Sequence, residues 1–238
     1  MDIMEKFDKV YEKIPGYYFG ILIGLIGAIT IGISAILFST AEQFTLFSHW
    51  ISNLGGATTQ SGISPNGSNV VFGIGLVIAA LLAIVFLVYA MKLLKPGNEK
   101  TIWLLYLDLL TGVVTIVGII IVAFFDMIAW LAIHGVGAVM FFMGGMLMVL
   151  FFTITLILNT EIPWKHSIPG FIVSGVFLIF LITFLPHLLG GIDLIALLGD
   201  TSLKYGWTRF WEWMVLFAIL SWFFIMGYLT YTLEKSMS

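Results

Sequence analysis

Apolar residues gather along the chain in six long runs separated by shorter polar segments. The hydrocarbon core of a bilayer is about 30 Å thick, so a helix needs roughly 20 apolar residues to cross it. All six runs are long enough, which predicts membrane-spanning helices at approximately 16–38, 69–93, 102–125, 129–157, 169–189 and 208–233. None of the connecting segments resembles a soluble domain. We therefore predict one domain over residues 1–238, an all-α membrane protein built as a six-transmembrane-helix bundle.

The composition leads to the same class of protein. Hydrophobic residues make up 61% of the 238 positions and charged residues only 10%, whereas soluble domains carry about 25% charged residues. The net charge of −3 offers no basic surface to attract nucleic acid. The chain has no cysteine, which excludes disulfides, thiolate nucleophiles and cysteine-bound metal.

Lysine and arginine are distributed unevenly between the tails and alternate connections. The side of a membrane protein that is richer in these residues faces the cytoplasm. Eight of them lie in the two tails and in the second and fourth connections (Lys6, Lys9, Lys13, Lys92, Lys95, Lys100, Lys165 and Lys235). The remaining two, Lys204 and Arg209, lie in or beside the fifth connection. We therefore predict a multi-pass protein of the cell membrane with both termini in the cytoplasm (N-in, C-in).

The first connection, residues 39–68, is predicted to be an outer loop. It is rich in Ser, Thr, Asn, Gln and Gly and contains no Lys or Arg. Asn66 begins the tripeptide Asn-Gly-Ser, which fits the acceptor pattern for N-glycosylation. Asn66 is therefore a glycosylation candidate.

Small residues recur at every fourth position of the first predicted span, at Gly20, Gly24, Ala28 and Gly32. Residues four apart share one helix face, and a face of small side chains lets another helix approach closely. We therefore predict a partner-helix face, which packs either against another helix of this bundle or against a partner subunit.

Asp108 is an acidic residue inside the third predicted span, with Thr111 and Thr115 at helical spacing after it. A charged group at the centre of a spanning helix costs about 2.5–3.5 kcal/mol on insertion scales, so such residues are functional candidates. One hypothesis is a polar contact that locks two helices, with Tyr89 of the neighbouring span as the hydrogen-bond donor. The alternatives are a proton or ion relay and a catalytic carboxylate.

A second group of polar residues is predicted near the outer surface. Asp126 closes the third span, His134 lies one to two turns inside the fourth, and Arg209 and Glu212 open the sixth. Arg209 and Glu212 are three residues apart and can pair on one helix face. We expect His134 to meet Glu212 or Asp126 at the mouth of an outer cleft, where these four residues could bind a ligand.

Few features of the sequence point to chemistry. Catalytic zinc usually has three protein ligands, and no pair within the outer group of histidines and carboxylates has the i, i+3 or i, i+4 spacing of a metal motif. A phosphate-binding glycine loop and a nucleophile elbow are also missing. We predict no metal and no cofactor.

Several short segments resemble the family catalogued as domain of unknown function 998, within the wider Frag/DRAM/Sfk-like group of six-span membrane proteins. These segments are "HWISNLGG", "NVVFGIGL", "FFDMIAWLAIHGVGAVMFF" and "FWEWMV". The resemblance implies a six-span fold and carries over the positions Ser52, Gly55, Asp126, His134 and Glu212. Members of the wider group are associated with lipid handling, membrane trafficking or autophagy.

These features favour a non-catalytic membrane protein that binds lipid or a partner chain, for example as an accessory subunit of a larger membrane complex. The first alternative is an outer-leaflet lipid-modifying hydrolase, with His134 as general base and Glu212 or Asp126 as its acidic partner. The second alternative is a small transporter that uses Asp108. The expected partners are membrane lipids and other membrane subunits.

Overall fold

Six long apolar helices are present in the computed structural model, which describes residues 3–94, 102–159, 162–188 and 206–237. They are α2 (Tyr17–Ser39), α3 (Ser68–Leu94), α4 (Ile102–Phe124), α5 (Leu131–Leu158), α6 (Ile168–Leu188) and α7 (Gly206–Met237). The described ranges contain no strand, so the predicted all-α class with six spans is confirmed. The predicted boundaries agree within one or two residues, except that α7 continues beyond residue 233 to Met237.

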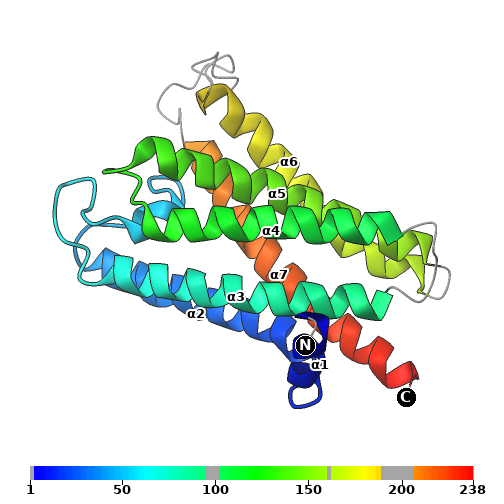
Figure 1. The fold of residues 1–238 in the computed structure, drawn as a ribbon. Helices are drawn as coiled ribbons and strands as arrows, with labels where there is room; N and C mark the ends of the chain where they lie inside the picture. Colours follow the sequence, from blue (N-terminus) through cyan, green and yellow to red (C-terminus); the bar gives the residue numbers. More distant parts are fainter. Residues whose placement is uncertain (1–2, 95–101, 160–161, 189–205, 238) are drawn as a thin grey trace.

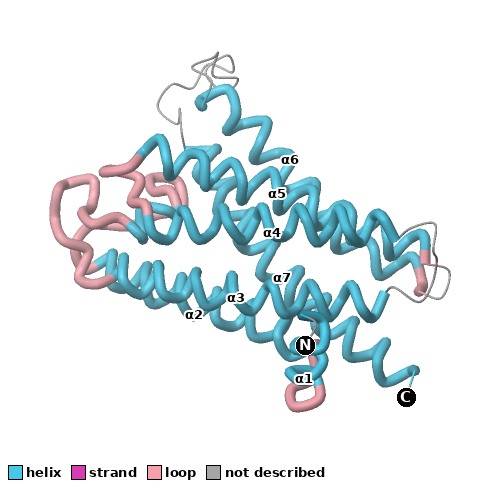
Figure 2. The backbone as a smooth tube through the Cα atoms, in the orientation of Figure 1, coloured by secondary structure: helices cyan, strands magenta, loops and turns pink. Residues whose placement is uncertain are grey.

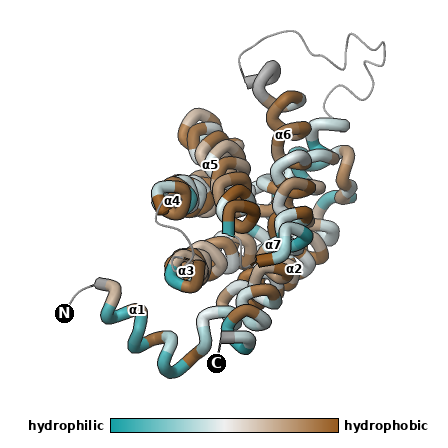
Figure 3. Tube along the Cα trace, turned by 90° about the vertical axis from the view of Figure 1, so that its right-hand side faces the viewer, coloured by the Kyte–Doolittle hydropathy of each residue, from teal (hydrophilic) through white to brown (hydrophobic). Residues whose placement is uncertain are grey.

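Three shorter helices complete the described structure: α1 (Ile3–Tyr11), η1 (Ile51–Gly55) and η4 (Trp164–Ser167). The sequence pattern did not predict α1, which is amphipathic and shows mostly hydrophilic colours in Figure 3. Its Tyr11 hydroxyl donates a hydrogen bond to the Val85 carbonyl at 2.8 Å, and Asp8 forms an ion pair with Lys92. Burial, followed by the charge of Asp8, raises the pKa of Tyr11. The N-terminal segment is therefore attached to the last turns of α3.

The spanning helices form a closed ring in chain order. Each packs against the next, from α2 to α7, and α7 packs back against α2. Figures 1 and 2 show the helices running roughly along one direction, with the loops at their ends. Because the helices surround a common axis, residues from distant parts of the sequence meet inside the ring.

Both termini lie at the same end of the bundle, which we call the tail end. The opposite end carries residues 40–67 and 125–130, and we call it the loop end (Figure 1). At the tail end the Tyr89 hydroxyl donates to Glu234 Oε2 at 2.8 Å, which connects α3 to α7. An even number of spans places both termini on one side of the membrane. Which side this is stays a prediction, and three residues used for it (Lys95, Lys100 and Lys204) lie outside the described residues.

The outer surface of the ring carries many exposed apolar side chains. Ile36, Leu110 and Leu131 are 69%, 58% and 67% exposed, a surface that suits lipid rather than water. The largest side chains of the interior, Trp222 and Phe86 among them, are fully buried. The bundle is thus packed inside and faces hydrocarbon outside, as a membrane-spanning structure requires.

The small-residue face of α2 is divided between two environments. A Cβ on Gly20 would lie 3.0 Å from the Gly227 Cα, and one on Gly24 would lie 2.5 Å from the Phe224 ring. These two glycines therefore face α7 of the same chain, which rules them out as a docking face for a partner subunit. Ala28 and Gly32 are exposed, and a Cβ on Gly32 would meet nothing within 4 Å.

Candidate functional site

A small apolar cavity lies inside the ring. Its volume is about 120 Å³, and side chains of α2, α3, α4, α5, α7 and η1 line it. Most of these are aliphatic or aromatic, and its ionisable members, His134 and Glu212, lie toward the loop end with Ser52. An apolar cavity of this size tends to stay dry and can hold a small apolar group. The cavity therefore suits a hydrocarbon segment rather than water.

A larger groove of about 620 Å³ adjoins this cavity. It is lined by the first turns of α5, by Trp50 and Ser52 of the outer loop, by Phe184 of α6 and by Glu212 of α7. The cavity and the groove share five lining residues: Ser52, His134, Ala138, Phe142 and Glu212. Together they form one continuous site. Its apolar interior and the polar residues at the junction come from segments that are far apart in the sequence.

His134 lies in the first turn of α5 and is only 6% exposed. Its Nδ1 lies 2.7 Å from the carbonyl oxygen of Phe125, which can only accept, so Nδ1 carries the proton. We expected an acidic partner, but the imidazole is held by a backbone carbonyl. In the neutral ring, Nε2 is then an acceptor, and no residue in the described ranges hydrogen-bonds with it.

Glu212 lies in the second turn of α7 and is 7% exposed. Its Oε2 accepts a hydrogen bond from the Ile51 backbone N–H at 2.8 Å. This bond fixes the start of η1 against α7 and brings the neighbouring Ser52 into the same site. The predicted pair with Arg209 is absent as an ion pair, and the Arg209 guanidinium carbon lies 5.6 Å from the Trp50 ring centroid.

Asp126 holds the backbone at the loop end and forms its hydrogen bonds with backbone N–H groups rather than with the His134 imidazole. Its Oδ2 accepts from Ala57 N–H, and its Oδ1 accepts from the N–H groups of Ile128 and Ala129. The carboxylate thus ties the α4–α5 turn to the outer loop. It lines neither the cavity nor the groove. Of the predicted cluster, His134 and Glu212 line the same site, while Asp126 supports the turn between α4 and α5. The charges of Asp126 and Arg209 still act on His134 and Glu212 respectively.

Asp108 is buried in α4, and its Oδ1 has no hydrogen-bond partner. The predicted bond from Tyr89 is absent because that hydroxyl donates to Glu234. Thr111 and Thr115 donate to carbonyls of their own helix, to Leu107 and Thr111 respectively. The polar stripe is thus three separate groups, and Asp108 is not part of the cavity or the groove.

The candidate glycosylation residue is accessible. Asn66 is exposed, has a positive φ of 52°, and donates from Nδ2 to Thr40 Oγ1 at 2.6 Å. Ser68 of the same tripeptide is fully buried, and its hydroxyl contacts the carbonyls of Ser34 and Leu54 at 2.9 and 2.7 Å. Ser68 therefore has a structural role in joining α2, η1 and α3, and modification of Asn66 stays a prediction.

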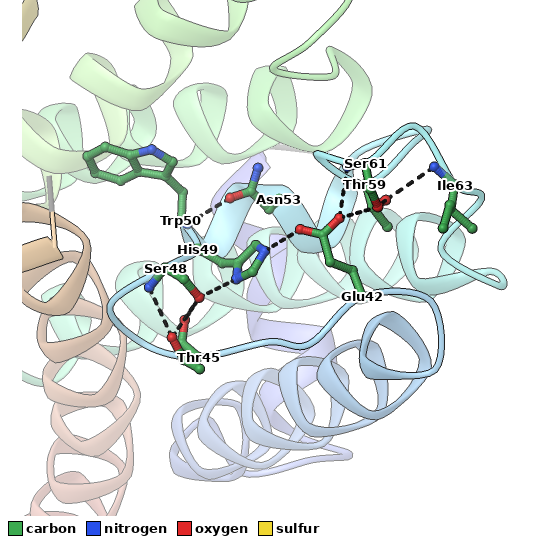
Figure 4. Close-up of polar contacts among 9 residues, drawn as sticks. All are labelled: Glu42, Thr45, Ser48, His49, Trp50, Asn53, Thr59, Ser61 and Ile63. Atoms are coloured by element: carbon green, nitrogen blue, oxygen red, sulfur yellow. Dashed lines mark hydrogen bonds and ion pairs between the residues drawn. The ribbon is translucent and has the colours of Figure 1, made fainter.

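A hydrogen-bond network in the outer loop was not predicted from the sequence (Figure 4). His49 is 3% exposed, and its Nε2 donates to Glu42 Oε1 at 2.8 Å, while Nδ1 lies 2.6 Å from Ser48 Oγ. The other oxygen of Glu42 accepts from the backbone and hydroxyl of Ser61 at 2.9 and 2.7 Å. The His49 carbonyl accepts from Trp213 Nε1 at 3.1 Å. Glu42 thus joins two parts of the loop, and His49 connects them to α7.

The protonation of Glu42 predicts a pH dependence of stability. Hydrogen bonds from His49 and then Ser61 lower the pKa of Glu42 from 4.5 to about 2. A group whose pKa is lower in the folded state than in the unfolded state stabilises the fold at pH values above its unfolded-state pKa. This stabilisation is lost as the pH falls through the folded-state pKa. We expect Glu42→Gln to reduce the free energy of unfolding by about 2 kcal/mol at pH 7. The difference from wild type should shrink between pH 4.5 and about 2 in unfolding titrations.

The control for this titration is Glu12→Gln, which changes an exposed carboxylate of the N-terminal segment. It should alter stability by less than about 0.5 kcal/mol at every pH. A constant difference between wild type and Glu42→Gln from pH 7 to pH 2 would contradict the assignment.

No protein-family model, curated protein or solved structure matches this chain. The resemblance to the domain of unknown function 998 family therefore stays a proposal. Within the described ranges, no three His, Asp or Glu side chains gather closely enough to hold a metal ion.

Proposed function

We propose that this membrane protein binds a lipid-like amphiphile without transforming it. The observation that carries the proposal is the junction of an apolar cavity with a lateral groove at Ser52, His134 and Glu212. Binding sites for small molecules are mostly apolar with a few polar groups that fix orientation, and they measure about 300–1,000 Å³. The groove alone, at about 620 Å³, is within that range.

The shape of the site favours a single hydrocarbon chain over a protein partner. A helix is about 10–12 Å wide with its side chains, so it cannot enter a cavity of about 120 Å³. The groove is bordered by α5 residues that face outward, among them Val136, which is 58% exposed. An amphiphile in the surrounding bilayer could therefore reach the site sideways.

The polar residues support binding more than catalysis. A general base needs its reactive nitrogen close to the substrate, and it is commonly oriented by an acidic partner. His134 is instead oriented by the Phe125 carbonyl, and its hydrogen bonds in the described structure include none to Glu212 or Asp126. Three positions carried over from the family resemblance line the same site: Ser52, His134 and Glu212. Because members of the wider group are associated with lipid handling, this supports a lipid-binding role.

The proposed orientation places both termini in the cytoplasm of the cell and the loop end at the outer leaflet. The charge distribution of the tails and connections supports it. The binding site, which lies toward the loop end, would then exchange ligand with the outer leaflet.

Blocking the junction tests the proposed function. We expect 10-bromo-1-decanol to quench the tryptophan fluorescence of the protein in phosphatidylcholine nanodiscs saturably, because Trp50 lines the groove. Ala138 is 9% exposed and lines both the cavity and the groove. Ala138→Phe fills this junction and should weaken saturable quenching at least tenfold, and Ala138→Leu should have a smaller effect.

The matched control is Ala28→Phe, which adds the same volume to an exposed position of α2. It should leave quenching unchanged, and circular dichroism should show the same helix content in all variants. Quenching that is equally strong in the Ala138 and Ala28 variants, or that never saturates in wild type, would overturn the proposal.

A further inference from the structure

The junction of the cavity and the groove offers a hydrogen-bond acceptor that has no donor among the described residues. His134 donates from Nδ1 to Phe125, which leaves Nε2 as an acceptor in the neutral ring. Among the described residues none hydrogen-bonds with this atom. The side chain is 6% exposed and lines both spaces. A buried acceptor without a donor costs free energy, so a ligand that supplies a donor would bind more strongly here.

Glu212 adds a second acceptor to the same junction. One carboxylate oxygen, Oε2, accepts from Ile51 N–H, and within the described part of the chain no donor reaches the other oxygen, Oε1. No ion pair to Glu212 is formed by the described residues. The carboxyl group is therefore buried in an apolar space without an ion-pair partner among the described residues, so a ligand that brings a cationic or hydrogen-bonding group would stabilise it.

Ser52 is the third polar residue of the junction and is the adaptable one. Its hydroxyl contacts Met127 Sδ at 3.4 Å, and a thioether sulfur is only a weak acceptor. The hydroxyl can therefore turn toward a ligand at small cost, either donating or accepting.

We propose that the amphiphile bound at this junction carries a hydrogen-bond-donating head, a hydroxyl or an amino group, which donates to His134 Nε2 and Glu212 Oε1. This inference rests on the proposed function and specifies its ligand class. A hydroxyl can donate to His134 Nε2, and an amine can form an ammonium–carboxylate pair with Glu212. The hydrocarbon chain then occupies the apolar cavity or groove.

The same arrangement disfavours an anionic head. A carboxylate or phosphate would bring a negative charge into an apolar space whose lining residues include no Lys or Arg, and an unpaired buried charge is costly. It would also bring no proton for the His134 Nε2 acceptor. Arg209 lies over the Trp50 ring and lines neither the cavity nor the groove, so it does not contact a head group bound at the junction.

Competition between matched amphiphiles tests the head-group preference. Wild-type protein in nanodiscs is quenched by 10-bromo-1-decanol and then titrated with 1-decanol, decylamine, methyl decyl ether or decanoate. We expect 1-decanol or decylamine, or both, to compete at least tenfold better than the ether and decanoate. The stronger of the two donors identifies the head as a hydroxyl or an amine.

Removal of the Glu212 carboxyl group provides the second arm. Glu212→Gln keeps the size of the side chain but cannot form an ammonium–carboxylate pair, so decylamine should lose at least tenfold in competition. Glu234→Gln is the matched control, because Glu234 is at the tail end of the same helix and binds Tyr89; it should not change competition by decylamine. His134→Phe, which removes Nε2, should weaken competition by 1-decanol.

The outcomes separate this inference from the proposed function. If saturable quenching is absent in wild type, ligand binding itself fails. If quenching is saturable but all four amphiphiles compete equally, or if Glu212→Gln leaves their ranking unchanged, lipid binding stands and the head-group inference is wrong.

Discussion

Gly118→Ala should be the most disruptive single methyl addition in the bundle. A Cβ on Gly118 would lie 2.5 Å from the Phe141 backbone nitrogen and 2.6 Å from the Gly137 carbonyl oxygen. Both atoms belong to the backbone of α5, so no side-chain rotation can relieve the contact. The helices α4 and α5 would have to separate, which also loses their close packing. We expect a loss of about 3 kcal/mol in the free energy of unfolding, the upper end for overpacking.

The control is Gly175→Ala on α6, where an added Cβ would meet nothing within 4 Å. Alanine favours helix over glycine by up to about 1 kcal/mol, so this variant should be as stable as wild type or slightly more stable. Unfolding by SDS titration in mixed micelles measures both. Equal stability of the Gly118 and Gly175 variants would mean that α4 and α5 do not approach as closely as described.

Trp213→Ala should have the second large effect, at the loop end. Trp213 is 2% exposed, lies 5.4 Å from the Phe44 ring and donates its Nε1–H to the His49 carbonyl. Replacing a buried tryptophan with alanine costs about 3–5 kcal/mol through lost contacts and the cavity that remains. The outer loop would also lose its attachment to α7. We therefore expect a lower unfolding midpoint together with faster proteolysis within residues 40–67.

Two further variants serve as controls for the effect of Trp213→Ala. Trp213→Phe keeps most of the apolar contact but leaves the His49 carbonyl without its donor, so it should lose only about 1–2 kcal/mol. Trp164→Ala removes a tryptophan that is 71% exposed and should change stability by less than about 1 kcal/mol. If Trp213→Ala unfolds like Trp164→Ala, the loop does not depend on this anchor.

The ligand site was only partly predictable. His134 and Glu212 stood out because ionisable residues are rare in spanning segments, and both line the junction. Their partners could not be read from the sequence, since a backbone carbonyl and a backbone N–H carry no residue-specific signal. Asp126 was expected in the cleft, yet backbone N–H groups close to it in space occupy its carboxylate.

Other interactions depend on which faces of the helices meet. Tyr89 was expected to bond Asp108, but the rotation of α3 directs it to Glu234 at the tail end. Glu42 and His49 gave no recognisable motif because their contacts depend on the folding of a loop without periodicity. The glycine stripe of α2 predicted close packing, but not that α7 would occupy only its first half.

The sequence by itself determined six apolar helices that cross a membrane, because hydrophobic length and scarce charge follow from composition and order along the chain. Tertiary structure decided how those helices close into a ring, which side chains line the space within it, and which acceptors lack donors there. The physical reason is that hydrophobicity is a property of each segment, whereas helix rotation, close approach and hydrogen-bond satisfaction are properties of pairs of segments brought together by folding.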